Sequence, residues 1–307
     1  MTVIEGTPRC SVILRCKNSE RTIGQALAAL FSQDFRDFDL LAVDSGSTDR
    51  TLEILSHFPH RQIRIDPWEY FPGKVLNRAV VETRGEIIVF LNSDAAPLTA
   101  GALRRLIAAF DEPEVQGAFA RQVPRPDAEA WVRRDYAVSF PDAQDPPAWI
   151  PYSLPLAAMR RSAWERHPFY TDAWGSEDIE WGVYARKEGW KVRYVPDAIV
   201  MHSHNYTLRQ LYGRRFIEGE ADAWIHGRPL RLPVTVVRTI ASSLRDIAPC
   251  VRERQWTGIL LAPIRRLTFH WAYLRGHRHG TRRRRRGDTD ASVGQQTVLS
   301  RHADSGG

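Results

Sequence analysis

Long apolar runs are missing from this sequence of 307 residues. The apolar stretches that stand out, such as residues 87–91 and 259–262, are far shorter than the ~18 residues that a membrane-spanning helix requires. The amino terminus, MTVIEGTPRC, also lacks a basic start followed by an apolar core, so no secretory signal is expected. These absences predict a cytoplasmic protein without a helix that crosses a bilayer.

Cysteine is scarce, and two phosphate-binding motifs are missing. Cys10, Cys16 and Cys250 are an odd number without paired metal-type spacing, which predicts free thiols in a reducing compartment. No G-x-G-x-x-G follows the first apolar run, and no G-x-x-x-x-G-K-[ST] occurs anywhere. The sequence therefore supports neither a dinucleotide-binding fold nor a P-loop.

Acidic residues are rare in one part of the chain only. Residues 228–286 hold 15 Arg against two acids, Asp246 and Glu253, a net charge of +13. Residues 1–227 have a net charge of −4, so the total of +7 comes from a basic C-terminal segment. Such an asymmetry indicates an anionic surface as a partner.

Short apolar runs alternate with helical patterns in the first part of the chain. SVIL at residues 11–14, FDLLAV at 38–43 and IIVFL at 87–91 predict buried strands, and residues 63–66 predict a short edge strand. Apolar residues at helical spacing lie between them. Repeated β-α units with right-handed crossovers predict an α/β fold, with a mostly parallel sheet covered by helices on both faces.

Polar residues stand where these strands end. Asp44 follows the second strand, and residues 92–94 (Asn-Ser-Asp) follow the strand at 87–91. Because the carboxyl ends of parallel strands share one edge of the sheet, Asp44 and Asp94 are expected in one ligand-binding crevice. Two alternatives remain open: Asp44 forms an Asx turn, or residues 92–94 only cap the next helix.

The second half supplies a helix start with two acids. Residues 122–148 are rich in Pro, Asp and Ala and are predicted to be irregular. Further on, Ser176 is a suitable N-cap for a helix whose first turn contains Glu177 and Asp178. Acids at this position also stabilise the helix dipole without any other role.

Two histidines follow a pair of predicted strands, at residues 191–195 and 198–201. His202 and His204 are spaced i, i+2, which places both imidazoles on one face of an extended chain. Imidazole is a ligand that suits transition ions such as Mn²⁺ better than Mg²⁺. Packed or exposed histidines without a ligand are the alternative.

Several ordered motifs together resemble a known family. SVILRCKNSERTI, LLAVDSGSTDRT and GKVLNRAVVETRGEIIVFLNSDAAP are similar to the nucleotide-binding half of the inverting family 2 glycosyltransferases, which have the GT-A fold. The aromatic loop before GKVLN, with Trp68, Tyr70 and Phe71, resembles the rhamnosyltransferase-like branch. The resemblance extends over residues 11–219 and implies a nucleotide-sugar donor.

The resemblance implies roles at a nucleotide site. Asp44 would accept a hydrogen bond from the N3–H group of uracil or thymine, while Leu14 and Arg15 line the base pocket. Lys74 and Asn77 lie one helical turn apart and would face the base or the diphosphate. A solvated surface lysine is the alternative for Lys74.

A divalent cofactor, Mn²⁺ or Mg²⁺, is also implied. Asp94 matches the last residue of the family's metal-binding D-x-D or D-D element, and His202 or His204 would complete the site. This sequence departs from the pattern, because Asn92 and Ser93 stand where a second carboxylate often lies. Ser93 would add a hydroxyl or a water-mediated contact, since one carboxylate with phosphate oxygens and water can hold such an ion.

The resemblance assigns the acid pair to the chemistry. Glu177 and Asp178 match the family's E-D pair, in which the aspartate is the general base that deprotonates the acceptor hydroxyl. Attack opposite the leaving group inverts the anomeric centre. Trp174 and the irregular residues 122–148 would then lie on the acceptor side.

The C-terminal part changes character. From residue 230 to 275 apolar positions and arginines alternate at helical spacing, with several aromatics. Attachment of residues 230–286 to an anionic membrane and a helical subdomain packed on the catalytic body both remain open. The predicted organisation is a GT-A domain at 1–219, with a nucleotide-binding half at 1–110 and an acceptor half at 111–219, a basic amphipathic helical extension at 220–280, and a disordered Arg-rich tail at 281–307.

The resulting expectation is a non-processive inverting glycosyltransferase. It uses a UDP- or dTDP-sugar and a lipid-linked or cell-envelope glycan acceptor, at the inner face of the cell membrane if the basic segment attaches there. Processive relatives carry membrane spans and Q-x-x-R-W, whereas here Gln210 is followed by LYGRRF. The rival is a catalytically degenerate GT-A fold that binds nucleic acid or another polyanion through its arginines, which is disfavoured because base-stacking aromatics are missing after Gly276.

Overall fold

The structure, a computed structural model, describes residues 7–143, 145–252, 254 and 256–302. The chain divides into two compact units. The first unit consists of the residues up to Ala128, together with Val132–Phe169 and Glu177–His204. The second unit consists of Glu129–Trp131, Tyr170–Ser176 and the residues from Asn205 onward.

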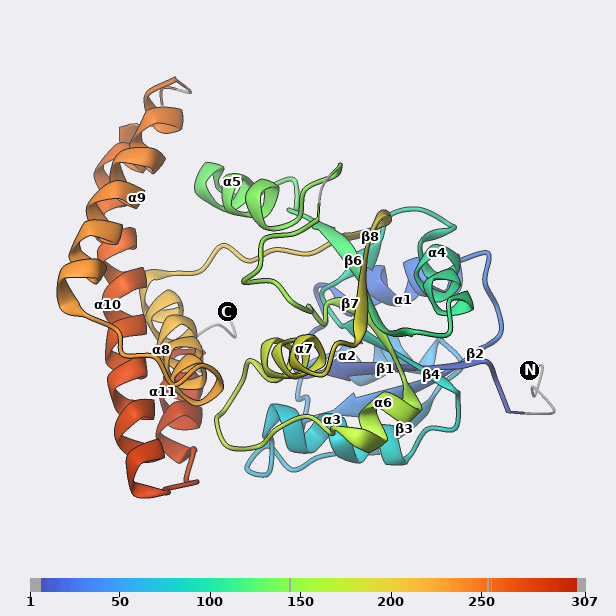
Figure 1. The fold of residues 1–307 in the computed structure, drawn as a ribbon. Helices are drawn as coiled ribbons and strands as arrows, with labels where there is room; N and C mark the ends of the chain where they lie inside the picture. Colours follow the sequence, from blue (N-terminus) through green and yellow to red (C-terminus); the bar gives the residue numbers. More distant parts are fainter. Residues whose placement is uncertain (1–6, 144, 253, 255, 303–307) are drawn as a thin grey trace. The chain divides into compact units, whose positions relative to one another are not determined.

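The first unit is built on a mixed sheet (Figure 1). Its strands are β1 (Cys10–Cys16), β2 (Phe38–Asp44), β3 (Arg61–Arg64), β4 (Ile87–Asn92), β5 (Ala96–Pro97), β6 (Val115–Val123), β7 (Leu156–Arg160) and β8 (Lys191–Met201), in the order β3-β2-β1-β4-β7-β6-β8-β5. β3, β2, β1 and β4 are parallel, as are β6 and β8, whereas β7 and β5 pair antiparallel with their neighbours. The predicted α/β fold with a mostly parallel sheet is confirmed.

Helices cover both faces of this sheet (Figure 1). They are α1 (Ile23–Phe31), α2 (Thr51–Ser56), α3 (Pro72–Val81), α4 (Ala102–Ala108), α6 (Arg161–Arg166) and α7 (Glu177–Lys187), with a 3-10 turn, η1 (Ala109–Asp111), after α4. Val12 and Leu14 of β1 belong to a core with α1 and α4, whereas the intervening Ile13 belongs to a second core with α3 and α7. The continuous apolar strands therefore reflect burial on both faces.

Two elements differ from the sequence prediction. A helix, α5 (Ala130–Ser139), lies within residues 122–148, which were predicted to be irregular. The two strands predicted at 191–195 and 198–201 are one strand, β8. Its pairing with β6 continues across a register shift, which lies between Ala120 and Arg121 of β6. This bulge accommodates Pro196, which cannot donate a hydrogen bond to the ladder.

The second unit is helical after residue 205. Its helices are α8 (Leu208–Ile225), α9 (Leu232–Arg252), α10 (Trp256–Arg286) and α11 (Ser292–His302), and α10 packs along α8 and α9. α8 begins with a capping box, in which Thr207 accepts from the Gln210 backbone N–H and the Gln210 side chain accepts from Thr207. Over the described part of the chain, every helix is too short or too polar to cross a membrane.

The predicted C-terminal organisation needs correction. The second unit includes the residues from Asn205, so the boundary predicted after residue 219 falls inside α8. Arg282–Arg286 of the predicted disordered tail form the last turn of α10, and the final residues, 303–307, lie outside the described part. Arg283 explains the difference, because its side chain is buried and bonded rather than solvated.

The buried partner of Arg283 is Glu220 of α8. The Arg283 Nη1 to Glu220 Oε1 distance is 2.6 Å, and Arg283 also donates to the Asp172 carbonyl oxygen at 3.1 Å. Burial raises the pKa of Glu220 despite the opposing guanidinium. Burying these two charges costs free energy, which their mutual attraction offsets. Removing either residue would leave the other charge buried without a partner.

Arg283→Met should lower the free energy of unfolding by about 3–5 kcal/mol, because it leaves a buried carboxylate without its cation. Arg282→Met, at the neighbouring exposed position, is the matched control and should change it by less than about 0.5 kcal/mol. The double variant Glu220→Gln with Arg283→Met should recover part of the loss in urea denaturation. Equal effects of the two single Arg variants would contradict this role.

Candidate active site

The ends of β4 and β8 meet because of a very short strand. β5 follows β4 after three residues and pairs antiparallel with β8, with Ala96 opposite Met201 and Pro97 opposite Val200. This pairing brings Asp94, in the turn between β4 and β5, beside the residues that follow β8. The same edge of the sheet carries the carboxyl ends of β1 and β2.

Asp94, His202 and His204 form one cluster. Their ligand atoms all lie within 4.8 Å of one another. The His204 Nε2 to Asp94 Oδ2 distance is 3.3 Å, and the His202 Nε2 to Asp94 Oδ1 distance is 3.7 Å. His202 is buried, whereas His204 and Asp94 are partly exposed. Two strand ends distant in sequence thus present three oxygen and nitrogen donors to one point.

His202 is held by groups behind it. Its Nδ1 lies 2.9 Å from Gln122 Oε1 and 3.4 Å from the Tyr136 hydroxyl, and Gln122 Nε2 donates to Ser153 Oγ at 2.8 Å. Because an amide oxygen only accepts, Nδ1 carries a proton, and Nε2, on the side of Asp94, is the nitrogen left to ligate a metal. This arrangement is typical of metal-ligating histidines, whose other nitrogen is bonded to an outer partner.

The electrostatics favour an ionised Asp94. Burial raises the pKa of Asp94, but His202, His204, a backbone hydrogen bond and Arg125 outweigh it and hold the pKa below its ordinary value. Arg125 also donates to the Asp94 carbonyl oxygen at 2.6 Å. One carboxylate and two imidazoles are a donor set that fits a divalent transition ion.

Asp44 and Ser93 already have partners at the strand ends. The Asp44 carboxylate is buried and accepts from the backbone N–H groups of Gly46 and Ser47 at 3.2 and 3.1 Å, as in an Asx turn. These bonds leave lone pairs on the carboxylate for a further donor. The Ser93 hydroxyl lies 2.9 Å from the Ser19 hydroxyl, in the loop after β1.

The acid pair at the start of α7 is linked to β1. Arg15 Nη1 lies 3.1 Å from Glu177 Oε1, and both side chains are largely buried. Burial lowers the pKa of Arg15, but Tyr70 and Glu177 more than offset this effect and raise it. Asp178 Oδ1 accepts from the Ile179 N–H at 2.9 Å, and its Oδ2 lies 3.4 Å from the Leu154 N–H. The sequence placed Arg15 at the base pocket, and the structure shows it joined to Glu177.

The remaining predicted residues have separate surroundings. Asn77 is a brace, because its amide accepts from Trp164 Nε1 and donates to the Phe169 carbonyl oxygen. Lys74 is exposed, with its ammonium 5.2 Å from the centre of the Phe71 ring. Leu14 is fully buried within β1, so only its backbone is at the strand end. Trp174 is buried in the second unit.

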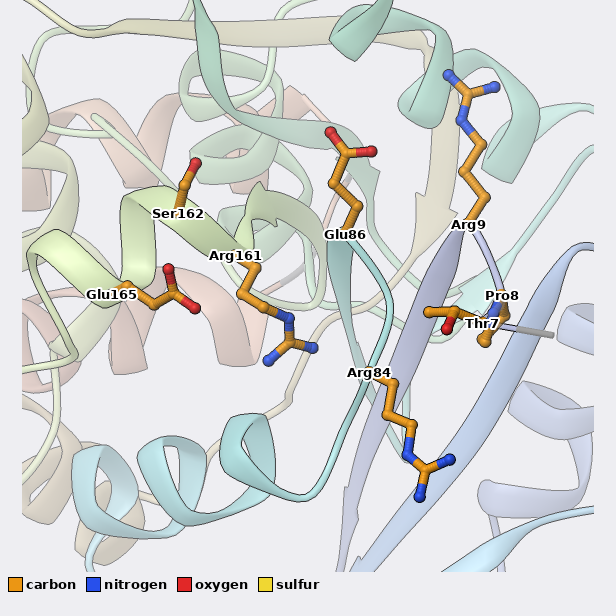
Figure 2. A pocket seen from close by; sticks show the side chains of 8 residues that line it. All are labelled: Thr7, Pro8, Arg9, Arg84, Glu86, Arg161, Ser162 and Glu165. Carbon is orange, nitrogen blue, oxygen red and sulfur yellow. The ribbon is translucent and has the colours of Figure 1, made fainter.

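A pocket lies at the opposite ends of the strands (Figure 2). It has a volume of about 530 Å³ and includes Arg9 and Glu86, which directly precede β1 and β4. Its charged groups serve the fold: Arg161 donates to the Gly85 carbonyl oxygen at 2.9 Å, and Arg9 pairs with Asp111 at 2.7 Å. This pocket therefore takes no part in the site at the carboxyl edge.

Sequence reasoning missed the residues that support the cluster. Gln122 and Arg125 belong to the stretch predicted to be irregular, and Ser19 lies in the loop after β1. Gln122 could have been noticed as a polar residue among the apolar residues of β6, where a buried amide requires a partner. No local signal marks Arg125, because its role depends on the turn that holds Asp94.

The chain is similar to several known proteins. Residues 11–175 match the family described as glycosyl transferase family 2. The O-antigen chain rhamnosyltransferase RfbN of Salmonella typhimurium is 30% identical over 226 residues, which cover 69% of this chain and 71% of that protein. The O-antigen chain rhamnosyltransferase WbaN of Salmonella anatum is 31% identical over 194 residues, covering 59% of this chain and 61% of that protein.

A solved structure shares the fold. The mannosyltransferase PcManGT from Pyrobaculum calidifontis, in complex with GDP-Man and Mn²⁺, superposes with a TM-score of 0.61 at 20% identity, covering 90% of this chain and 88% of that chain. Fold and motifs together define a glycosyltransferase with the GT-A fold. The chain belongs to glycosyl transferase family 2, as its resemblance predicted.

Proposed function

We propose that this glycosyltransferase transfers a sugar from a UDP- or dTDP-sugar to a lipid-linked or other cell-envelope glycan. The transfer is non-processive and inverts the configuration of the anomeric centre. The observation that carries the proposal is the cluster of Asp94, His202 and His204 at the carboxyl edge of the sheet. The same unit also contains the Glu177–Asp178 pair. A metal site and a base carboxylate are two of the parts that such a transfer needs.

The donor is held at the carboxyl edge. Asp94 with His202 and His204 would hold Mn²⁺ or Mg²⁺, which when bound would supply positive charge for the diphosphate leaving group. Asp44 and the strand end at Leu14 take the pyrimidine base, since the buried carboxylate keeps an acceptor position beyond its own turn. Lys74, being exposed and cationic, is available to the diphosphate.

The acceptor is activated by Asp178. An ionised carboxylate must reach the acceptor hydroxyl and take its proton. Arg15 supports this role indirectly, because its ion pair with Glu177 holds the first turn of α7 against the end of β1. We therefore assign Arg15 a second role besides lining the nucleobase pocket: it positions the general base Asp178.

The acceptor class rests on the relatives. RfbN and WbaN are named as O-antigen chain rhamnosyltransferases. A shorter match, 36% identical over 90 residues, is the poly(ribitol-phosphate) beta-N-acetylglucosaminyltransferase TarS of Staphylococcus aureus, and it covers 16% of that protein. The acceptors in these names are an O-antigen chain and a poly(ribitol phosphate), which supports a polymeric acceptor for this chain.

A thermal-shift panel of sugar nucleotides, with and without Mn²⁺, tests the donor. A UDP- or dTDP-sugar at 100 times its Kd should stabilise the protein by about 2.7 kcal/mol, and only when Mn²⁺ is present. Asp94→Asn should lose the Mn²⁺-dependent part of the shift. A shift with GDP-sugars alone would overturn the pyrimidine assignment, and co-purified nucleic acid without any sugar-nucleotide response would favour the polyanion-binding rival.

A further inference from the structure

The helices α9 and α10 carry their apolar residues on the outside. In a helix of a globular protein, apolar side chains normally face the core and polar ones face water. In α9 the buried residues include Thr235, Ser242, Ser243 and Asp246. Val237 and Leu244, in contrast, are 65% and 64% exposed. This polarity is the reverse of the pattern expected for a helix that packs only on its own protein.

The exposed residues of α9 form a continuous stripe. Val237, Ile240, Leu244 and Val251 recur at intervals of three, four and seven residues, which places them along one side of the helix. The interior side instead makes polar contacts. Ser242 Oγ, for example, lies 3.1 Å from His270 Nε2 of α10.

α10 repeats this arrangement over its first half. Trp256, Leu260, Ile264, Leu267 and Trp271 are exposed and recur at intervals of three or four residues, and Leu260 is 74% exposed. The two helices pack against each other and lie side by side in Figure 1.

The two helices are joined by an interior ion pair. Arg266 of α10 lies 2.5 Å from Asp246 of α9, with both side chains about 4% exposed. A charged pair is therefore buried in the hairpin while leucines and tryptophans face outward. The outward stripes of α9 and α10 are called the arm face below.

The charges beside the arm face have one sign. Arg238, Arg245 and Arg252 of α9 are exposed and follow one another at intervals of seven residues, so they form a row that flanks the apolar stripe of this helix. Asp246 is the only acid of α9, where it is buried, and α10 contains no acid. A second copy on this face would bring like-charged rows together, whereas an anionic surface would complement them.

We propose that the arm face docks in the interface of an anionic lipid bilayer. The leucine, valine and tryptophan side chains enter the boundary between headgroups and acyl chains, while the row of arginines lies at the level of the lipid phosphates. The helices lie on the membrane and do not cross it. The arm face shares no residue with the proposed donor site, so its failure and that of the proposed function can be distinguished.

Vesicle flotation of the full chain tests the proposal. Vesicles of phosphatidylcholine mixed with phosphatidylglycerol should carry the protein at low salt, and vesicles of phosphatidylcholine alone should carry much less. The double variant Val237→Gln with Leu244→Gln should lower the partition coefficient by at least tenfold, because it removes two apolar anchors. Val81→Gln, on an equally exposed valine of the first unit, is the matched control and should float as before.

The charge contribution is tested in the same assay. Arg238→Gln and Arg252→Gln should each lower partition about fivefold at low salt, while Arg78→Gln on α3 should not. Circular dichroism and the donor-induced thermal shift should be unchanged in all variants, since the exposed positions make no core contacts. Equal flotation of the double variant and wild type would overturn the proposal. So would a dimer in light scattering that the double variant dissociates, which would make the arm face a contact between copies.

Discussion

Asp178→Asn should abolish sugar transfer while leaving donor binding intact. General base catalysis contributes about 10²–10⁴ to the rate, and the amide that replaces the carboxylate cannot take a proton at neutral pH. The substitution keeps the size of the side chain and the oxygen that accepts from the Ile179 N–H. A loss of kcat with an unchanged donor-induced thermal shift is therefore expected.

The neighbouring acid provides the control. Glu180 lies in the same first turn of α7, but its carboxylate is 3.0 Å from His167 Nε2, and His167 stacks on Tyr184. Glu180→Gln should therefore change stability more than kcat. Single-turnover assays of both variants with one donor separate the two effects. If Asp178→Asn transfers sugar at the wild-type rate, the base is another residue.

Arg15 connects this chemistry to the sheet. Its guanidinium keeps Glu177 in place from the end of β1, and the residues are 162 positions apart in sequence. A hydrophobic pattern within one segment cannot indicate a contact between residues so far apart in the sequence. The sequence identified Glu177 and Asp178 through their position at a helix start, but their partner became visible only when β1 and α7 were placed together.

The fold of the first hundred or so residues could be predicted because its signals are local. β1 and β4 are apolar runs that end in polar residues, and consecutive parallel strands bring such ends together by a general rule of chain topology. Asp44 and Asp94 could thus be assigned to one edge of the sheet from spacing alone. The Asx turn of Asp44 was also foreseen as an alternative, because its partners lie two and three residues away.

The second half could not be predicted in the same way, because its strands depend on distant partners. β7 (LAAMR) has a composition that favours a helix, yet it pairs antiparallel with β4 and β6. Arg283 shows the same limit. Five consecutive arginines indicate disorder when taken alone, but a buried Glu220 in α8 changes the environment of one of them and continues the helix.

Removal of divalent metal should abolish transfer, and added Mn²⁺ should restore it. Asp94→Asn removes the only carboxylate of the cluster formed with His202 and His204, so we expect at least a hundredfold loss of Mn²⁺ affinity. Gln122→Ala should lower the affinity about 10–100-fold, because Gln122 bonds the nitrogen of His202 that faces away from Asp94 and is not itself one of the three clustered ligand residues. The measurement is Mn²⁺ titration by calorimetry or electron paramagnetic resonance, alongside turnover after chelation.

Variants of a metal ligand and of its outer partner should lose Mn²⁺ affinity to different extents. In the proposed metal site Asp94 and His202 would contribute donor atoms directly, whereas Gln122 would act only through the Nδ1 proton of His202. Gln122→Glu should keep that hydrogen bond and retain more affinity than Gln122→Ala, which a purely structural role in β6 would not require. Ser93→Ala is the control at the position of the missing second carboxylate, since the Ser93 hydroxyl is already bonded to Ser19. Unchanged turnover after thorough chelation would show that the cluster stabilises the turn after β4 rather than the leaving diphosphate.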